Sequence, residues 1–223
     1  MIKSKFKLSK IHNLHLGSDI FILANGPSIL AENLNLLKNK IVIGMNASTL
    51  LESDFDFVSQ YYVVSDTRFI THPQKKIYAT EMLNKETKRV FRKELKEFDD
   101  ISYYSRTSYV PALGKDGFSF NLLQGFYFGC TTTMLALQLA FYLGAKRIFI
   151  LGCDLKYSGE TPRFYKEDIV QEVDRFTGVQ IKNIRNAYLC CKDLGIELYS
   201  CSETSYLRNY IPFIKFCDAV SDK

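Results

Sequence analysis

Short apolar runs of β-type composition alternate along the chain with longer segments of helical pattern. The runs cover residues 19–24, 41–45, 61–65, 101–104, 147–151 and 196–200. The helical patterns lie at 28–37, 81–97, 131–143 and 168–194. Such alternation predicts an α/β fold, a Rossmann-like and mostly parallel sheet with helices on both faces. We expect residues 1–223 to form a single domain.

The segment between the third and fifth predicted strands is rich in Lys, Arg and Glu. Residues 75–97 read as one basic amphipathic helix. Its simplest interpretation is a solvated helix with ion pairs at i,i+4, and the alternative is a lid or docking face for an anionic acceptor. Residues 105–120 carry Gly, Pro and polar residues that predict a mobile loop. We therefore expect residues 72–120 to form a small basic lid or an insertion.

Polar residues follow four of the predicted strands directly. These clusters are Asn25-Gly26-Pro27-Ser28, Asn46-Ala47-Ser48, Asp66-Thr67-Arg68 and Asp154. Ligands of an open α/β sheet bind at the carboxyl ends of its strands. The four clusters therefore predict one shared site.

The turn at residues 25–28 runs from a strand into a predicted helix. Gly26 lets a ligand approach the backbone, and Pro27 suits a first helical turn. The Ser28 hydroxyl and backbone N–H groups at a helix N-terminus can bind a phosphate. This predicts a nucleotide-binding domain, although an ordinary strand-to-helix turn explains the same short pattern equally well.

The other strand ends offer further candidate ligands. The Asn46 amide can read a base or a ribose, and a helix cap is its alternative role. The Asp154 carboxylate can hold ribose hydroxyls or begin a turn. Thr131, Thr132 or Thr133 can cap the helix that follows.

Five residues are candidates for catalysis. The Asp66 carboxylate can bind Mg²⁺, hold a ribose or accept a proton. His72 lies in the following loop and is the weaker candidate for a base, since a lone loop histidine is more often a surface residue. Phenol and guanidinium groups in a polar loop can stabilise a departing phosphate, and this loop supplies Tyr157, Arg163 and Tyr165.

Composition and charge narrow the classes of partner. The net charge of +5 favours nucleotides, acidic glycans or a membrane surface, and no nucleic-acid-binding signature occurs. Six cysteines without a C-x-x-C pair, and no secretory signal, predict a cytoplasmic protein. The apolar run 206–216 can seat the protein on the inner face of a membrane or on a second copy, or form a helix that closes the core.

Five ordered segments resemble one protein superfamily. They read ILANGPSI, IGMNAS, YYVVSDTRF, GCTTTMLALQLAFYLGAKRIFILGCDLKY and IELYSCSETSYL. The order is similar to that of the bacterial lipooligosaccharide sialyltransferases and the 6-hydroxymethylpterin-diphosphokinase-like proteins of surface-glycan loci. The resemblance covers residues 19–207. It implies a CMP pocket formed by Asn25, Gly26, Ser28, Asn46, Thr131, Thr132 and Asp154, with Tyr157 and Tyr165 assisting the leaving phosphate.

The chain departs from the sialyltransferase pattern in two places. Those enzymes carry a His general base before the last long helix, where this chain reads TPRFYKEDIVQEVDRF. They also carry an Arg before the Thr/Ser pair, where this chain has Gly129-Cys130. The expected base is therefore Asp66, with His72 second.

Three functions remain open on these residues. The leading one is a glycosyltransferase that moves a CMP-activated sugar to a glycan or glycolipid acceptor without a metal or added cofactor. The second is pyrophosphoryl transfer from ATP to a hydroxymethylpterin-like alcohol, with Asp66 and Asp154 binding Mg²⁺. The third is a nucleotide-binding module that has lost its catalytic base.

Overall fold

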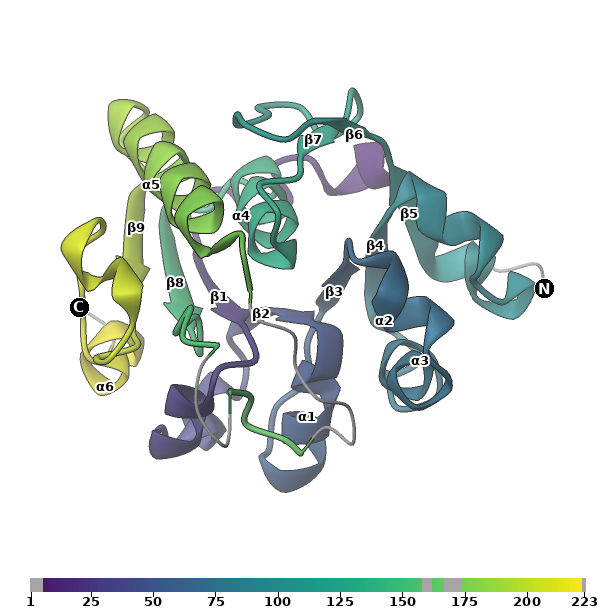
Figure 1. The fold of residues 1–223 in the computed structure, drawn as a ribbon, viewed down its shortest axis with the longest axis horizontal. Coiled ribbons are helices and arrows are strands. Elements are labelled where there is room, and N and C mark those ends of the chain that lie inside the picture. The colour runs from purple at the N-terminus through teal and green to yellow at the C-terminus, as the bar shows by residue number, and fades with distance from the viewer. Residues whose placement is uncertain (1–5, 158–161, 167–173, 222–223) are drawn as a thin grey trace.

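A seven-stranded parallel sheet forms the centre of the molecule (Figure 1). The computed structural model describes residues 6–157, 162–166 and 174–221. The strand order is β5-β4-β3-β2-β1-β8-β9. The bounds are β1 Asp19–Leu23, β2 Ile41–Met45, β3 Tyr61–Val64, β4 Lys88–Arg92, β5 Thr107–Val110, β8 Arg147–Leu151 and β9 Glu197–Ser200. The predicted parallel sheet is confirmed.

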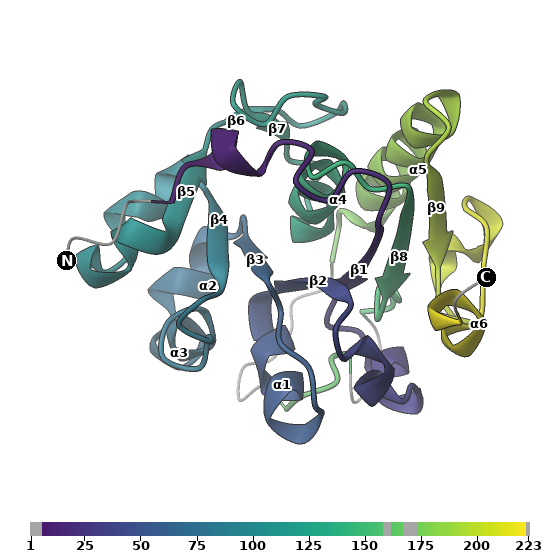
Figure 2. The same cartoon turned by 180° about the vertical axis from the view of Figure 1, so that it is seen from behind.

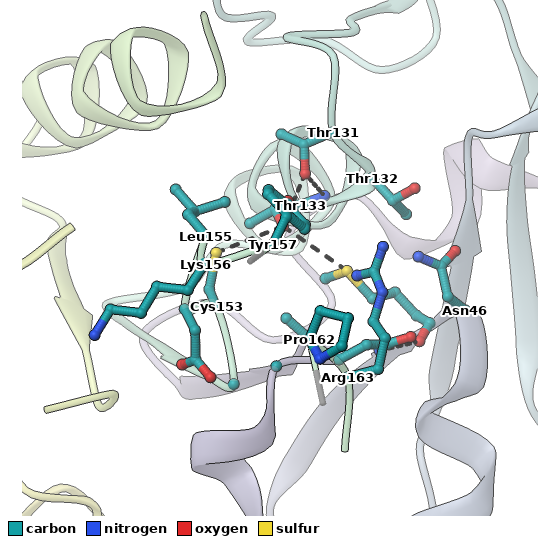
Figure 3. Close-up of a pocket in the computed structure, with 16 residues that line it drawn as sticks. Asn46, Thr131, Thr132, Thr133, Cys153, Leu155, Lys156, Tyr157, Pro162 and Arg163 are labelled. Carbon is teal, nitrogen blue, oxygen red and sulfur yellow. Dashed lines mark hydrogen bonds between the residues drawn. The ribbon is translucent and has the colours of Figure 1, made fainter. Parts of the chain in front are cut away.

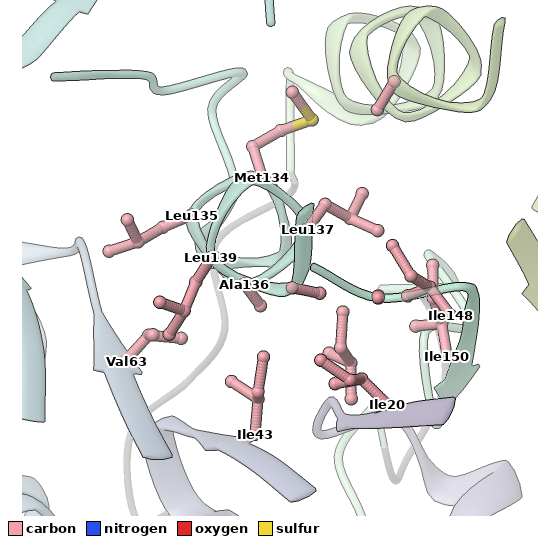
Figure 4. Packing of buried hydrophobic residues seen from close by; sticks show 14 of the residues in the cluster. Ile20, Ile43, Val63, Met134, Leu135, Ala136, Leu137, Leu139, Ile148 and Ile150 are labelled. Carbon is pink, nitrogen blue, oxygen red and sulfur yellow. The ribbon is translucent and has the colours of Figure 1, made fainter. Parts of the chain in front are cut away.

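Alternating side chains of each strand feed two separate cores. Ile20 and Ile22 of β1 point toward helix α4 (Thr132–Tyr142), whereas Phe21 and Leu23 point to the opposite face. This is the two-residue period of a strand that is buried on both sides. Figure 4 shows the first core, where α4 lies over Ile20, Ile43 and Val63. The predicted helix at 131–143 is confirmed as α4.

Helices cover both faces of the sheet (Figures 1 and 2). On the α4 face lies α5 (Thr177–Asp193), which packs on α4 and β9. The other face carries several short helical elements, of which η2, η3 and η5 are 3₁₀ segments. They are η2 Pro27–Ala31, η3 Leu34–Leu37, α1 Leu51–Asp54, α2 Thr67–Thr71, α3 Pro73–Ala79, η5 Lys93–Glu97 and α6 Phe216–Val220.

The strand order reverses between β1 and β8. The chain builds β1 through β5 outward in one direction, then returns to add β8 on the other side of β1 and β9 beyond it. At such a reversal the loops that leave the two neighbouring strands turn apart. They open a crevice at the carboxyl ends of the strands, which is where ligands of these sheets bind.

The predicted helix over residues 75–97 is wrong. Helix α3 ends at Ala79, and Lys88–Arg92 form strand β4 between β3 and β5. Val90 and Phe91 are buried on opposite faces of that strand, and Arg89 is buried as well. Residues 72–120 therefore supply two strands of the central sheet, which corrects the prediction that this segment is a lid or an insertion.

Two neighbouring predictions also change. Residues 101–104, predicted as a strand, belong to the 3₁₀ segment η6 (Ile101–Arg106), and the strand β5 follows it. The predicted loop at 105–120 contains β6 (Ala112–Gly114), which pairs in parallel with β7 (Phe126–Tyr127). The segment η1 (Leu8–Ile11) lies before the first strand.

The remaining helix predictions hold in part. The predicted helix at 28–37 is replaced by η2 and η3, because Glu32 between them has extended backbone. The predicted helix at 168–194 is observed as α5, and residues 168–173 of that prediction lie outside the described residues. Along the C-terminal run, Leu207, Ile211 and Phe216 are buried, so the run with η7 (Tyr206–Asn209) closes the core. Within the described ranges, every helix is too short or too polar for a bilayer crossing.

Candidate functional site

A small cavity of about 50 Å³ lies at the strand-order reversal (Figure 3). Its walls come from the ends of β1, β2 and β8, from the N-terminus of α4 and from residues 155–157 and 162–163. Most of the sequence-predicted site residues line it, namely Asn25, Gly26, Asn46, Thr131, Thr132, Asp154, Tyr157 and Arg163. Pro27, Ser28, Asp66, His72 and Tyr165 do not.

Gly26 packs tightly against the turn after β8. Its N–H donates to the Gly152 carbonyl at 2.6 Å. A Cβ added at Gly26 would lie 2.5 Å from Asp154 Oδ2 and 2.6 Å from the Gly152 carbonyl oxygen. A glycine is required here because the ends of β1 and β8 approach each other closely. The neighbour that needs the space is the protein's own chain, whereas the sequence predicted a ligand.

Ser28 is bound to Asp154 and not to the cavity. Its N–H donates to Asp154 Oδ2 at 2.9 Å, and its hydroxyl donates to Oδ1 of the same carboxylate and lies 2.9 Å from Ser202 Oγ. Pro27 begins the 3₁₀ segment η2 as predicted. The turn does receive an anion, but that anion is the carboxylate of Asp154. The N–H and hydroxyl of Ser28 that were expected to bind a phosphate therefore donate to Asp154 in this structure.

The Asn25 side chain holds two strand ends together. Its Nδ2 donates to the Met45 carbonyl and its Oδ1 accepts from the Ala47 N–H, both at 3.0 Å. Both ends of the amide are thereby used by the backbone around Asn46. Asn25 therefore fixes the backbone on both sides of Asn46.

Asn46 carries an unsatisfied polar atom into the cavity. Its Oδ1 is buried and has no hydrogen-bond partner among the described residues, and its backbone is left-handed with φ 51°. Leaving such a group unpaired costs about 1–3 kcal/mol. Cys130 (φ 57°), beside Thr131, and Leu155 (φ 55°) are left-handed too. Strained backbone of this kind clusters at binding sites, where a ligand compensates it.

The N-terminus of α4 forms a wall of the cavity. Thr131 Oγ1 accepts from the Thr133 N–H at 3.3 Å, which confirms the predicted cap. Thr132 Oγ1 lies 2.9 Å from Ser65 Oγ and so joins the helix to the end of β3. Free N–H groups and the dipole of this eleven-residue helix favour an anion at its start. The positive helix end at the cavity is therefore that of α4.

Arg163 lies in the cavity wall without a carboxylate partner in the described ranges. Its Nε is buried and unpartnered there, and its guanidinium carbon is 5.4 Å from the centroid of the Tyr157 ring. Figure 3 shows the guanidinium directed to the same space as Asn46 and Thr132. A half-buried cation in this setting suits an anionic ligand.

The Tyr157 hydroxyl is already engaged. It donates to Gln180 Oε1 at 2.8 Å, and Gln180 Nε2 donates to Asp174 at 3.1 Å. Burial raises the pKa of Tyr157 above its usual value, so the phenol stays protonated at neutral pH. Tyr157 thus supports Arg163 through its ring. Sequence reasoning missed Gln180, whose role depends on α5 lying beside the cavity.

The predicted bases lie beside the cavity wall and outside its lining. Asp66 follows Ser65 directly, caps α2 by accepting from the Arg68 N–H at 3.0 Å, and pairs with the Arg68 guanidinium at 2.8 Å. His72 lies between α2 and α3 with Nδ1 buried and unpartnered among the described residues. Tyr165 packs edge-on against Tyr78, 6.1 Å between ring centroids.

The residues predicted to bind Mg²⁺ do not come together. Only Asp154 lines the cavity, and both of its oxygens accept from Ser28. The Asp66 oxygens are engaged by Arg68. Across residues 6–157, 162–166 and 174–221 no group of three His, Cys, Asp or Glu side chains is arranged for a metal. These side chains do not fit the predicted metal site.

The cavity thiol is inert. Cys153 is fully buried, and this burial raises the pKa of its thiol to about 12. A thiol in that state is not a nucleophile at neutral pH.

A protein-family model matches most of the sequence. The profile described as "6-hydroxymethylpterin diphosphokinase MptE-like" matches residues 1–160. The chain belongs to this family. No curated protein matches it.

Solved structures of transferases share the fold of this MptE-like chain. The sialyltransferase CstII from Campylobacter jejuni, bound to cytidine-5'-monophosphate, gives a TM-score of 0.59 at 16% identity over 93% of this chain and 88% of that one. CST-II with a trisaccharide acceptor and CMP gives 0.51 at 15% over 92% and 88%. The Maf glycosyltransferase from Magnetospirillum magneticum AMB-1 gives 0.64 at 12% over 93% of this chain, which spans only 34% of that protein. The resemblance to the diphosphokinase-like proteins is confirmed by the family match, and the likeness to the sialyltransferases holds for the fold.

Proposed function

We propose that this chain is a glycosyltransferase that uses a CMP-activated sugar. One observation carries the proposal: Asn46 Oδ1 and Arg163 Nε are both buried and unpartnered among the described residues, and both belong to the cavity at the strand-order reversal. An acceptor and a cation that line one cavity suit an amino group and the phosphate of a cytidine nucleotide. The fold shared with CMP-bound CstII supports the same nucleotide.

In the proposed complex, Asn46 Oδ1 accepts from the cytosine amino group. The phosphate lies between Arg163 and the N-terminus of α4. As the bond to the sugar breaks, negative charge grows on the departing phosphate, and these two positive groups stabilise it in a site shielded from water. A cavity of about 50 Å³ is smaller than the roughly 300–1,000 Å³ of typical ligand pockets. Nucleotide entry therefore requires the cavity to widen.

We assign the proton of the attacking hydroxyl to Asp66, with His72 second. Asp66 is one residue beyond Ser65, whose hydroxyl contacts Thr132 of the cavity wall. Its ion pair with Arg68 is exposed, so the acceptor can displace it at small cost. A glycan or glycolipid acceptor is proposed; a glycolipid would place the reaction at the inner face of the membrane.

A second candidate is diphosphoryl transfer to a hydroxymethylpterin-like alcohol. The description of the matching family favours it. Both Asp154 oxygens accept hydrogen bonds from Ser28, which weighs against the two-aspartate Mg²⁺ site that this reaction was expected to use.

Thermal-shift titrations with CMP, CDP and ATP, each with and without Mg²⁺, test the proposal. CMP should raise the melting temperature without metal, and Asn46→Ala and Arg163→Ala should abolish most of that rise. Arg175→Ala is the control, since it removes an exposed arginine that lines no cavity. An ATP shift that needs Mg²⁺ would favour the second candidate. CMP binding without transfer from any sugar donor would indicate a degenerate module, and no response to any nucleotide would contradict the proposal.

A further inference from the structure

A second, larger hollow lies along α5. We call it the α5 groove; its volume is about 640 Å³, and it is lined by α5 residues from Gly178 to Leu189, by Asp116 and Gly117, and by Tyr210. This volume is within the range of roughly 300–1,000 Å³ that small-molecule sites occupy. None of the predicted site residues belongs to the α5 groove.

One edge of the α5 groove is rigidly built. Asn183 is buried; it donates to Asp116 Oδ1 at 2.8 Å and accepts from the Gly117 N–H at 3.2 Å. Lys182 Nζ pairs with Asp116 Oδ2 at 2.9 Å. These bonds fix the loop at 116–117 against the helix, and they neutralise the only carboxylate in the lining.

Two polar side chains of the α5 groove are available to bind a ligand. Within the described ranges, the Arg185 guanidinium and the Asn186 amide have no hydrogen-bond or ion-pair partner. Tyr210 and Leu189 expose 44% and 41% of their surface beside them. A flat aromatic side chain next to a planar amide and a guanidinium suits the apolar face and the hydroxyls of a sugar ring. The unpaired guanidinium adds a preference for an acidic substituent.

The α5 groove adjoins the small cavity through the first turns of α5. Gln180, which holds the Tyr157 hydroxyl of the cavity, lies within one turn of Asn183. A Cβ added at Gly129 would lie 3.0 Å from Asn183 Cβ, and Gly129 is two residues before Thr131 in the cavity wall. A chain of sugars can therefore extend from the cavity along the helix.

We propose that the α5 groove binds an acidic oligosaccharide, the distal part of the acceptor. The inference rests on the proposed glycosyltransferase function. Arg185 binds the carboxylate or phosphate of that saccharide, Tyr210 packs against a ring and Asn186 bonds to ring hydroxyls. The reacting sugar then lies at the cavity, which is nearer the N-terminus of α5 than the distal saccharide is.

Saccharide binding measured by NMR without nucleotide tests this inference. The probes are 3'-sialyllactose, a glucuronic-acid disaccharide and glucose 6-phosphate, with neutral lactose for comparison. At least one acidic probe should bind more tightly than lactose. Arg185→Ala should weaken it about ten-fold, the loss of one charge-assisted hydrogen bond, and Tyr210→Ala several-fold. Lys192→Ala, on the same helix and outside the α5 groove, should leave binding unchanged.

Three results would overturn the inference: no acidic probe binds, the neutral sugar binds equally well, or both groove variants bind like the native chain. A size-exclusion profile that shows a dimer lost in Tyr210→Ala would assign the α5 groove to a second copy instead. CMP thermal shifts on the same variants should be unchanged. The saccharide assay contains no nucleotide, so failure of CMP binding and failure of the α5 groove are seen separately.

Discussion

Two arginines of this molecule, one buried and one half-buried, have different surroundings. Arg89 in β4 is completely buried and pairs with the equally buried Asp99 at 2.7 Å, and Tyr109 donates to the other oxygen of that carboxylate at 2.6 Å. Its guanidinium also lies over the rings of Phe91 and Tyr103. Arg163 contacts one ring and, among the described residues, has no acid beside it.

The difference separates a structural charge from a binding charge. The Arg89 pair connects β4 to the segment that follows it, so the protein itself neutralises the cation. The charge of Arg163 faces a cavity where a ligand can neutralise it. A buried ion pair loses much when one partner is removed, whereas an unpaired cation costs the empty protein energy. Breaking the Arg89 pair should therefore lower stability, whereas removing Arg163 should weaken ligand binding.

Asp99→Ala should produce the largest effect. It leaves Arg89 buried without its acid, and we expect a loss of about 3–5 kcal/mol in the free energy of unfolding. Urea denaturation measures it. Asp56→Ala is the control, because its pair with Lys38 is exposed to solvent and should contribute little to stability. Equal losses in the two variants would refute the structural role of the Arg89 pair.

Gly26→Ala should have the next largest effect. The new Cβ meets the Asp154 carboxylate and the Gly152 carbonyl, so we expect a destabilisation of about 1–3 kcal/mol and weaker CMP binding. At Gly178 an added Cβ meets nothing within 4 Å, and Gly178→Ala should be neutral or slightly stabilising. Denaturation of both variants gives the comparison, and a harmless Gly26→Ala would contradict the tight strand-end contact.

Arg163→Ala should change binding more than folding. Removing this half-buried cation, which has no carboxylate partner among the described residues, should alter the free energy of unfolding by less than about 1 kcal/mol, while CMP affinity falls about ten-fold or more. Calorimetric titration and urea denaturation on the same sample separate the two effects. A large loss of stability with unchanged CMP affinity would make Arg163 a second structural arginine.

Alkaline pH should lower stability by a smaller amount. Burial raises the pKa of Tyr61 to about 12, above the value near 10 of an unfolded tyrosine. Between these values the unfolded chain binds fewer protons than the folded one, so the free energy of unfolding falls as pH rises above about 10. Tyr61→Phe should flatten that decline in urea melts between pH 9 and 11. An unchanged slope would show that Tyr61 does not contribute.

Much of the fold is predictable from local patterns. The strands at β1, β2, β3, β8 and β9 are apolar runs between helical segments, and α4 has a clear cap and a glycine after its end. Strand β4 was missed because its sequence KRVFR looks like a polar surface. Only the tertiary partners Asp99 and Tyr109 make a buried Arg89 feasible, and they are not visible in a local pattern.

The sequence predicts where the cavity lies better than it predicts the hydrogen-bond partners of the residues around it. Polar residues at strand ends pointed to the correct edge of the sheet, since parallel strands bring their ends together. The partner of each donor depends on distant residues. Ser28 was expected to meet a phosphate, but a carboxylate 126 positions away takes its N–H and hydroxyl. Asn25 likewise bonds to the backbone of the next strand end.

The most direct test is a crystal structure of the protein with CMP. The account predicts the phosphate within hydrogen-bond distance of Arg163 and the first turn of α4, the cytosine amino group at Asn46 Oδ1, and Asp154 still held by Ser28. CMP bound on another face of the sheet, or with its phosphate at Ser28 and Arg163 turned away, would contradict the central claim.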